Sequence, residues 1–493
     1  MSGGASGGPE GEAFTRSLTM PVNLIPRPPE KTSMEFANNL TRVTALAFGI
    51  ASALACGQAQ ASAFQLRENS VKAQGRAMAG SASAYGDASV VANNPAMMST
   101  FKEKTLQADV TAVDLSFEFT GGGNAAAGSA LQQPLTGGDG GDAGDLTPVP
   151  ASAFILPLSG SFEYVTLGMM VSAPFGLKTD YDRNWVGRYH AVESDVRIID
   201  LTLSASLELS ERFSVGVGAI IERSDVTLSN AIDFGTGICA NPATQSLCFM
   251  PNPITGPYGP QKNDGFVSVE GDDTSFGWLF GVSWRPTDRL SLGYTHRSEI
   301  KHEVSGTATF EVPANAAFLT STGQYVTGPG GAKLTLPSTD TFSATFQATD
   351  RLAVMAEASL TGWESLEEVR IEFGNPAQPD SAEDYNWGDS WFYSVGAEYK
   401  ISDRFTVRGG VGRDESPVSL PYRTPRMPDQ DRNWYAVGLT WAATDNLEIS
   451  GSYTRIQLAD DPQVDLVSSS GSRLVGTYDG GADLYGISMQ YRF

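Results

Sequence analysis

The chain has 493 residues, of which 18 % are charged, and it contains 53 Gly, 16 Tyr, 24 Phe and 8 Trp. Few charges with many glycines and aromatics favour an all-β protein, and disordered chains lack this many aromatic residues. The formal net charge of −23 argues against nucleic acid as a partner.

The N-terminal region predicts export. Residues 1–33 are rich in Gly, Pro and Ser and indicate a disordered or non-native start, and residues 34–63 have the form of a secretory signal peptide. Their apolar run, 43–55, is too short to span a membrane, and no later stretch reaches the roughly 18 apolar residues that a spanning helix needs. Cleavage after Ala61 or after Ala63 fits the small-residue pattern.

Residues 64–101 show no period of two and are rich in small residues, including Gly75, Gly80 and Gly86. Such a segment suits short helices packed tightly inside a tube, and a free periplasmic tail is the alternative. Because the segment carries little charge for a free tail, we expect an N-terminal hatch that plugs a barrel formed by residues 102–493.

Short turns and long connections alternate along residues 102–493. The tight turns are PLSGSF (157–162), SERF (210–213), TDRL (287–290 and 349–352), SDRF (402–405) and TDNL (444–447). Longer excursions cover roughly 119–150, 174–195, 229–272, 306–336, 362–387, 414–430 and 458–480. Six turns and seven loops join 14 strands.

Strict alternation places all short turns on one rim and all long loops on the other. A soluble sandwich, which is the alternative for the hairpins, has no reason to sort its loops in this way. We therefore predict a 14-stranded antiparallel transmembrane β-barrel of the bacterial outer membrane. Aromatic residues near strand ends are expected in its interfacial girdle: Trp278, Trp284, Trp363, Trp391, Tyr399, Trp434 and Trp441.

The third strand, VTLGMMVSAPFGLKTDY, contains Pro174 and Gly176. Proline gives no N–H to a ladder and glycine weakens a strand, so the wall can open here. The alternative is that Pro174 simply ends the strand at its outer rim.

Cys239 and Cys248 lie in one long loop, GICANPATQSLCFM. An exported protein with two nearby cysteines is expected to form a disulfide, with two free thiols as the alternative. The three histidines have no metal spacing and no nucleophile motif, so we expect no metal, no cofactor and no enzymatic activity.

Several stretches carry a family resemblance. FQLRENSVKAQGRAMAGSASAYGDASVVANNPAMM resembles the hatch of FadL-type long-chain fatty acid transporters, including the motif Asn94, Pro95 and Ala96. The resemblance continues in VSAPFGLKTDYDRNWVGRYHA, GYTHRSEIKHEVSG and GVGRDESPVSLPYRTPRMPDQDRNWYAVGL, and it reaches the last strand, ADLYGISMQYRF. It therefore covers essentially the whole mature chain.

The resemblance implies an uptake channel for long-chain fatty acids or other hydrophobic molecules. Ligand would be captured at the extracellular loops and released laterally into the bilayer through a gap at strand 3, formed by Pro174 and Gly176. An outer-membrane barrel hydrolase and a nonspecific porin are the alternatives. The terminal aromatic, Phe493, resembles the signal that the barrel-assembly machinery reads. The expected partners are that machinery and the outer-membrane lipids, around a monomer.

Site residues follow from the same resemblance. Charged residues expected to face the lumen and brace the hatch are Arg297, Arg413, Asp414, Asp429, Asp431 and Arg432, with a solvated loop as the alternative for the last five. Candidates for ligand binding are Phe64, Leu66, Phe175, Leu177 and Arg223. The family's carboxylate-binding Arg and Lys are replaced by Leu228 and Glu383, so either Arg223 or Arg370 substitutes for them, or the ligand is uncharged.

Overall fold

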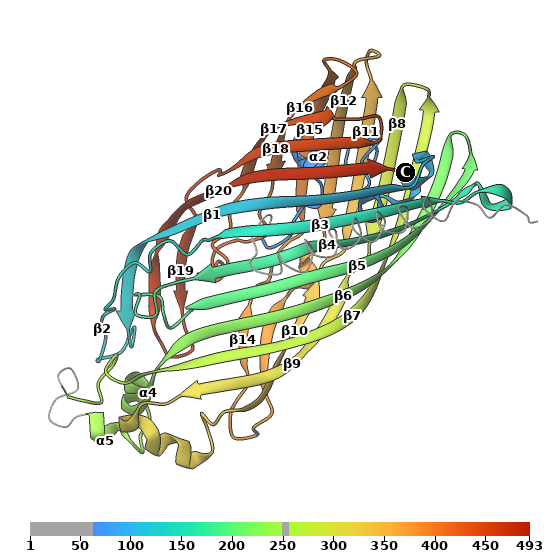
Figure 1. Cartoon of the computed structure of the whole chain (residues 1–493). Helices are drawn as coiled ribbons and strands as arrows, with labels where there is room; N and C mark the ends of the chain where they lie inside the picture. Colours follow the sequence, from blue (N-terminus) through green and yellow to red (C-terminus); the bar gives the residue numbers. More distant parts are fainter. Residues whose placement is uncertain (1–62, 249–255) are drawn as a thin grey trace, which may run out of the picture. The chain divides into compact units, whose positions relative to one another are not determined.

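The last strand of the chain pairs with the first, and this pairing closes an antiparallel sheet into a barrel (Figure 1). The computed structural model describes residues 63–248 and 256–493, which belong to one unit. β1 (Thr105–Ala125) and β20 (Arg473–Arg492) pair continuously from Thr105↔Arg492 to Asn124↔Arg473. This closure removes both edges of the sheet, as a lipid-embedded sheet requires.

The wall has 14 strands, as predicted. Ten are continuous or nearly so, and four are interrupted and appear as pairs: β8/β9, β11/β10, β12/β13 and β15/β14. Short β2 and β19 add to β1 and β20. Their bounds are β2 (Gln133–Pro134), β3 (Leu146–Pro157), β4 (Val165–Asp180), β5 (Glu193–Ser210), β6 (Phe213–Asp233), β7 (Asp264–Thr287), β8 (Leu290–Arg297), β9 (Ile300–Glu311), β10 (Gly328–Leu336), β11 (Thr339–Gln347), β12 (Leu352–Thr361), β13 (Glu368–Phe373), β14 (Ser381–Asp384), β15 (Ser390–Lys400), β16 (Phe405–Asp414), β17 (Arg432–Ala442), β18 (Leu447–Leu458) and β19 (Gln463–Val467).

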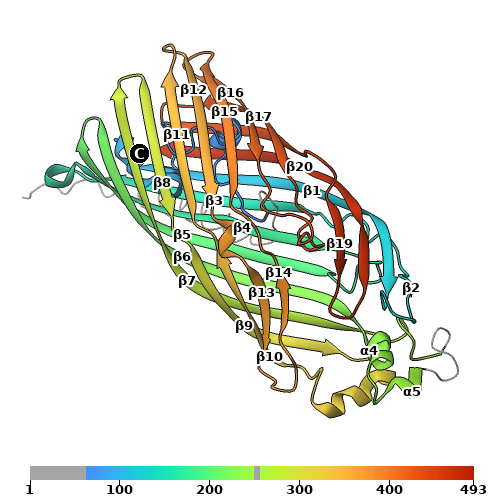
Figure 2. The same cartoon turned by 180° about the vertical axis from the view of Figure 1, so that it is seen from behind.

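The predicted tight turns all join neighbouring wall strands, and they gather at one end of the barrel (Figures 1 and 2). Thr349 and Thr444 each accept a backbone N–H from the leucine three residues on, as a self-capped turn requires. The opposite end holds the larger helical connections, α4 (Phe234–Ala240), α5 (Gln245–Cys248) and η3 (Ala314–Thr322). By contrast, η2 (Gly160–Phe162) lies in a tight turn, and η4 (Trp363–Ser365) lies in the interruption between β12 and β13. Strands take up part of several predicted excursions, because β1, β4, β6 and β7 extend beyond the predicted ends.

A segment of short helices fills the barrel interior. It contains α2 (Val71–Gln74), α3 (Val90–Asn93) and η1 (Pro95–Thr100), and nearly all of its residues are buried. α2 contacts β17, β18, β20 and β1, whereas η1 contacts β4 to β7, so the segment touches distant parts of the wall. We call this segment the hatch. The predicted start (1–33) and signal peptide lie outside the described residues, apart from Ala63.

Wall glycines allow the hatch to approach the sheet closely. A Cβ atom built on Gly410 of β16 would lie 2.2 Å from the backbone oxygen of Arg76 in the hatch. A Cβ on Gly75 would similarly lie 2.9 Å from the Cα atom of Gly438 in β17. Only glycine fits such contacts between two backbones.

The outward face of the wall is apolar. On β20 the outward side chains of Tyr485, Ile487 and Met489 are exposed, and the residues between them point inward or are small. Lipid is the environment that such a face requires. Exposed aromatics near the tight turns fit an interfacial girdle, namely Tyr164, Phe213, Trp284, Tyr399 and Trp441.

The girdle prediction was wrong for two tryptophans. Trp363 and Trp434 are fully buried inside the barrel, because each occupies an inward position and packs on other aromatic rings. Among the helices that the structure describes, none is long and apolar enough to cross a membrane.

The close contact at Gly410 generates a prediction. Replacing Gly410 with Val forces the wall away from the hatch backbone at Arg76, and overpacking of this kind costs about 1–3 kcal/mol. We expect a lower unfolding midpoint in detergent, together with faster proteolysis of the hatch in the folded barrel.

Gly409 provides the matched control. It neighbours Gly410 on the same strand, and the nearest atom to a Cβ built on it is 3.8 Å away. Gly409→Val should leave both readouts unchanged. Equal destabilisation by the two variants would show that the hatch contact is not the cause.

Candidate ligand-binding site

An apolar pocket lies inside the barrel beside the strand interruptions. Leu177 of β4 and Val196 of β5 line one side, Leu366 and Trp387 from two interruptions line another, and Phe64 reaches it from the start of the hatch. Its free volume is about 40 Å³, so side chains must separate to admit a ligand. Pockets of this apolar character suit hydrophobic ligands.

Aromatic rings form one wall of this pocket. The ring of Phe64 lies 5.8 Å from that of Phe175 and 5.0 Å from that of Trp363, between ring centroids. Trp387 joins Trp363 at 5.3 Å and stacks on Tyr385 at 4.8 Å. The cluster combines residues from the hatch, β4 and two interruptions.

The ladder between β3 and β4 ends beside this cluster. The last pair is Ser152↔Val171, and among the described residues no part of β4 beyond Val171 pairs with β3. β4 nevertheless continues to Asp180 in register with β5. We call this place the β3–β4 break.

Beyond the break, β4 pairs with the hatch instead. The register of β4 against β5 shifts just before Phe175. The N–H of Leu66 donates to the carbonyl of Pro174, and the N–H of Gly176 donates to the carbonyl of Phe64, each at 2.8 Å. The bulge and the two hatch bonds therefore bend β4 towards the interior, at the proline and glycine that the sequence singled out.

Two further prolines mark the other side of the break, and the sequence analysis missed them. Pro148 and Pro150 of β3 pair with Ala112 and Val110 of β1. Because this β1 ladder runs through both prolines, their missing N–H groups fall on the side that faces β4. The pattern LTPVPAS, with prolines two residues apart in an otherwise strand-like segment, was the available signal of an edge.

Buried charges bound the pocket on the side of the tight turns. On β6, Val226 lines the pocket, and Glu222 follows two inward positions nearer the turns. Arg297 bridges Glu222 at 2.5 Å and Asp200 at 2.6 Å, and His302 lies 3.0 Å from Glu222. An apolar ligand gains nothing among these charges. Arg297 thus faces the lumen, and these ion pairs join wall strands.

Arg426 is the one charged residue in the described lining of the pocket. Its Nη1 atom donates to the hydroxyl of Ser194 at 3.0 Å and to the carbonyl of Glu193 at 3.1 Å, and its Nε atom lies 3.3 Å from a carboxylate oxygen of Glu383. The guanidinium is therefore already engaged by acceptors.

The two arginines proposed as substitutes do not reach the pocket. Arg223 points outward from β6 and pairs with Asp225 at 3.0 Å, with its side chain about half exposed. Arg370 pairs with Glu368 at 2.8 Å and is not part of the lining. The expectation for Arg223 fails because it has the outward parity of its strand. Leu228, which has the inward parity, lines the pocket.

The remaining ligand candidates divide into two groups. Phe64 and Leu177 line the pocket, and Phe175 packs in the adjoining aromatic cluster. Leu66, by contrast, belongs to a different apolar cluster with Trp434, so its side chain faces away from the pocket.

Two of the residues expected to brace the hatch bind the backbone of Ala63, which directly precedes it. Asp429 accepts the N–H of Ala63 at 2.9 Å, and Arg432, which is ion-paired with Asp429, donates to the carbonyl of Ala63 at 3.4 Å. Arg413 and Asp431 pair with each other at 2.5 Å, and Arg413 has the outward parity of β16, so its luminal placement was wrong. Asp414, the next residue, is buried.

The main ionic contacts of the hatch come from α2 and the turn that follows it, and the sequence analysis did not identify them. Lys72 lies 2.7 Å from Glu448 of β18, and Arg76 lies 2.7 Å from Glu398 of β15. The two cations are four residues apart in the chain, so this part of the hatch reaches the wall at two places. The sequence indicated these contacts only through Glu448 and Glu398, which are charged residues at inward positions of their strands.

The motif Asn94, Pro95 and Ala96 joins the hatch to the wall. The amide of Asn94 donates to the carbonyls of Ala82 at 2.8 Å and Val282 at 3.0 Å. Its side-chain oxygen accepts the N–H of Ala96 at 3.1 Å and so caps η1, in which Pro95 is the first residue. One side chain therefore fixes a hatch turn, a helix start and a wall strand.

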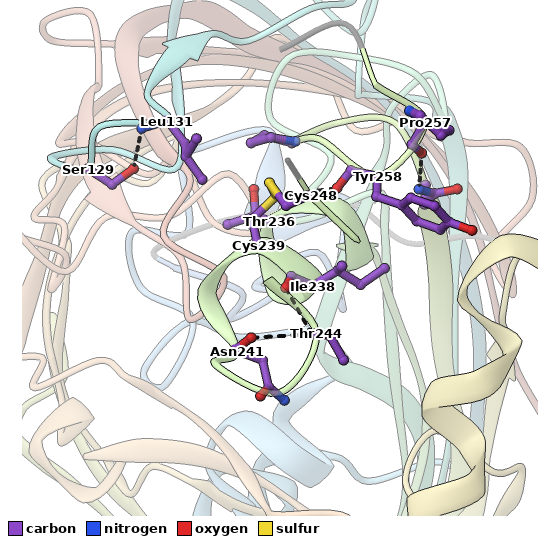
Figure 3. The surroundings of a disulfide bond; sticks show 12 residues. Ser129, Leu131, Thr236, Ile238, Cys239, Asn241, Thr244, Cys248, Pro257 and Tyr258 are labelled. Atoms are coloured by element: carbon purple, nitrogen blue, oxygen red, sulfur yellow. Dashed lines mark hydrogen bonds between the residues drawn. A yellow bond between two sulfur atoms is a disulfide. The ribbon is translucent and has the colours of Figure 1, made fainter. Parts of the chain in front are cut away.

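Cys239 and Cys248 are joined by a disulfide with an S–S distance of 2.04 Å (Figure 3). The bond links α4 to α5 in the connection between β6 and β7, far from the tight turns. Within residues 63–248 and 256–493, no group of three or more His, Cys, Asp or Glu side chains could hold a metal ion.

Comparison with known proteins gives full-length matches. Outer membrane protein P1 of Haemophilus influenzae is 28% identical over 463 residues, covering 89% of this chain and 97% of that protein. The long-chain fatty acid transport protein of Escherichia coli O6:H1 is 26% identical over 467 residues, covering 92% and 99%.

Solved structures agree with these matches. A FadL homologue from Pseudomonas aeruginosa superposes with a TM-score of 0.79 at 25% identity, covering 87% of this chain and 100% of that chain. The Pseudomonas putida toluene transporter TodX, at 14% identity, shares the fold with a TM-score of 0.62 over 85% of this chain and 97% of its own. The model of the family described as outer membrane protein transport protein (OMPP1/FadL/TodX) matches residues 52–493. The chain therefore belongs to this family of outer-membrane transport proteins.

Proposed function

We propose that this protein takes up long-chain fatty acids or other hydrophobic molecules, captures them at the extracellular loops, and releases them laterally into the bilayer at the β3–β4 break. The observation that carries the proposal is the position of an apolar pocket directly beside a place where the wall ladder ends. Relatives named as long-chain fatty acid and toluene transporters support this class of ligand.

Sideways release agrees with the energetics of hydrocarbon. Each CH₂ group moved from an apolar pocket into water costs about 0.8 kcal/mol, so an alkyl chain would resist release into the periplasm. The hatch and the charges around Arg297 lie on the periplasmic side of the pocket, whereas the β4 side offers an interrupted ladder. The easier direction is therefore into lipid.

The state of Arg426 supports an uncharged ligand. A carboxylate head group would have to compete with Glu383 for a guanidinium that already serves several backbone and side-chain acceptors. With Arg223 and Arg370 outside the pocket, a neutral hydrocarbon or a neutral polar head group fits better than a fatty acid anion.

We further propose that the protein transports without catalysis and acts as a monomer. Its partners are outer-membrane lipids and the barrel-assembly machinery. The curated relatives that carry a functional name are transport proteins. The filled interior argues against a nonspecific porin, because the hatch residues are buried against the wall.

The prolines at the break provide a test of lateral release. Combining Pro148→Thr, Pro150→Thr and Pro174→Val restores the missing N–H groups, so we expect the β3–β4 ladder to extend. Uptake of a labelled hydrophobic ligand by cells that depend on this protein should fall close to background, while the barrel still folds and inserts.

Pro286→Thr is the control, since this proline lies in β7 near a tight turn and away from the break. It should leave uptake unchanged. Normal uptake by the correctly folded triple variant would contradict lateral release at this place.

Glu383 provides a test of ligand charge. Wild-type protein should bind a long-chain alcohol more tightly than the fatty acid of equal length at neutral pH. Glu383→Gln removes the carboxylate beside Arg426 and should strengthen fatty acid binding by roughly tenfold, which corresponds to about 1.4 kcal/mol. Titration of purified protein in detergent measures both affinities.

Glu372→Gln is the matched control, because Glu372 pairs with Lys333 and does not line the pocket. It should not alter either affinity. Tighter binding of the fatty acid anion than of the alcohol by the wild-type protein would refute the uncharged-ligand proposal.

A further inference from the structure

The outer surface of the wall has a groove of its own, separate from the luminal pocket. It spans β3 to β7, has a volume of about 650 Å³, and is open to the side that faces lipid. No charged residue occurs in its described lining. We call it the outer groove.

Strand register explains why the surface is hollow there. In one row across the sheet, the outward residues Met169, Leu203, Ala219 and Trp278 are successive partners on β4, β5, β6 and β7. In the next outward row towards the tight turns, Ala205 of β5 lies between Leu167 of β4 and Val217 of β6. The two alanines are diagonal neighbours, so large side chains surround a floor made of small ones.

The outer groove begins next to the β3–β4 break. The row of Met169 includes its β3 partner, Phe154. The next outward row above it contains Ser152↔Val171, which is the last pair of that ladder. From there the groove leads towards the tight turns, on the periplasmic half of the wall. One row of side chains therefore separates the place where the ladder stops from a concave apolar track.

We propose that the outer groove is an exit site that binds the hydrocarbon chain of the transported molecule after it leaves the β3–β4 break, and that it directs the chain towards the periplasmic half of the bilayer. This inference rests on the proposed function. Continuity with the break favours the transported chain as occupant, since a chain emerging there meets this groove before bulk lipid. The rim of Phe154, Met169, Leu203 and Trp278 matches such a chain in polarity.

Filling the groove tests the proposal. The double variant Ala205→Leu with Ala219→Leu places larger apolar side chains on its floor, facing lipid, where such residues are tolerated. Cellular uptake should fall several-fold, while ligand binding to the luminal pocket, measured on purified protein, stays unchanged. Uptake at the wild-type rate would overturn the proposal.

Ala356→Leu is the matched control. Ala356 is an exposed, outward-facing residue of β12 with Val354 before it and no place in the groove lining. It should leave uptake intact. The triple proline variant separates the two proposals: if it abolishes uptake and the filled groove does not, only the exit site fails, whereas if it transports normally, lateral release itself fails.

A photoreactive probe identifies the source of the bound chain. A long-chain alkyl diazirine supplied from outside the cell should label Met169, Leu203 or Trp278, and the triple proline variant should lose this labelling because the probe no longer passes the break. Labelling that persists in that variant, or that arises equally from phosphatidylethanolamine carrying the diazirine in its acyl chain, would show a bilayer lipid in the groove and overturn the proposal.

Discussion

The whole structure depends on one constraint: in hydrocarbon, each backbone N–H and C=O of the wall must find a partner within the protein. Closure between β1 and β20 satisfies this around the barrel. The β3–β4 break is permitted because its unpaired groups are few. Prolines remove donors on the β3 side, and the hatch supplies hydrogen bonds to Pro174 and Gly176 on the β4 side. The need to pair backbone groups in hydrocarbon therefore explains both the closure of the barrel and the form of its interruption.

The hatch serves this arrangement as well as filling the lumen. Its first residues hold β4 inward, and Asp429 and Arg432 hold the backbone of Ala63 in turn. Its body is fixed by Lys72 and Arg76 at the wall and by glycine contacts too close for any other residue. Any movement of the first hatch residues would free the hydrogen-bonding groups of β4, so the hatch and the break form one mechanical unit.

The sequence predicted the architecture because its signals are local. Turn residues and alternation fixed the number of strands and the rim on which each turn lies. Pro174 indicated a weak ladder for a reason confined to its own chemistry. Side-chain partners were harder to predict than strands. Arg413 and Arg223 point outward, and one bulge or one misplaced strand end is enough to exchange the inward and outward positions of a strand. No local sequence pattern marks the interruptions that carry Trp363 and Trp387. Both indole rings pack on Phe64, which comes from a distant segment of the chain.

Charge distribution around the pocket separates the possible routes. Towards the tight turns a hydrocarbon would meet Arg297, Asp200 and Glu222, which are already paired and offer it no favourable contact. Towards β4 it meets Phe175 and then the end of a ladder, with an apolar groove on the far side of the wall. The lining of the lumen becomes charged towards the tight turns, whereas it stays apolar towards β4. A molecule that exchanges apolar contacts at every step has no large desolvation cost to overcome, and that continuity is what gives the proposed path its direction.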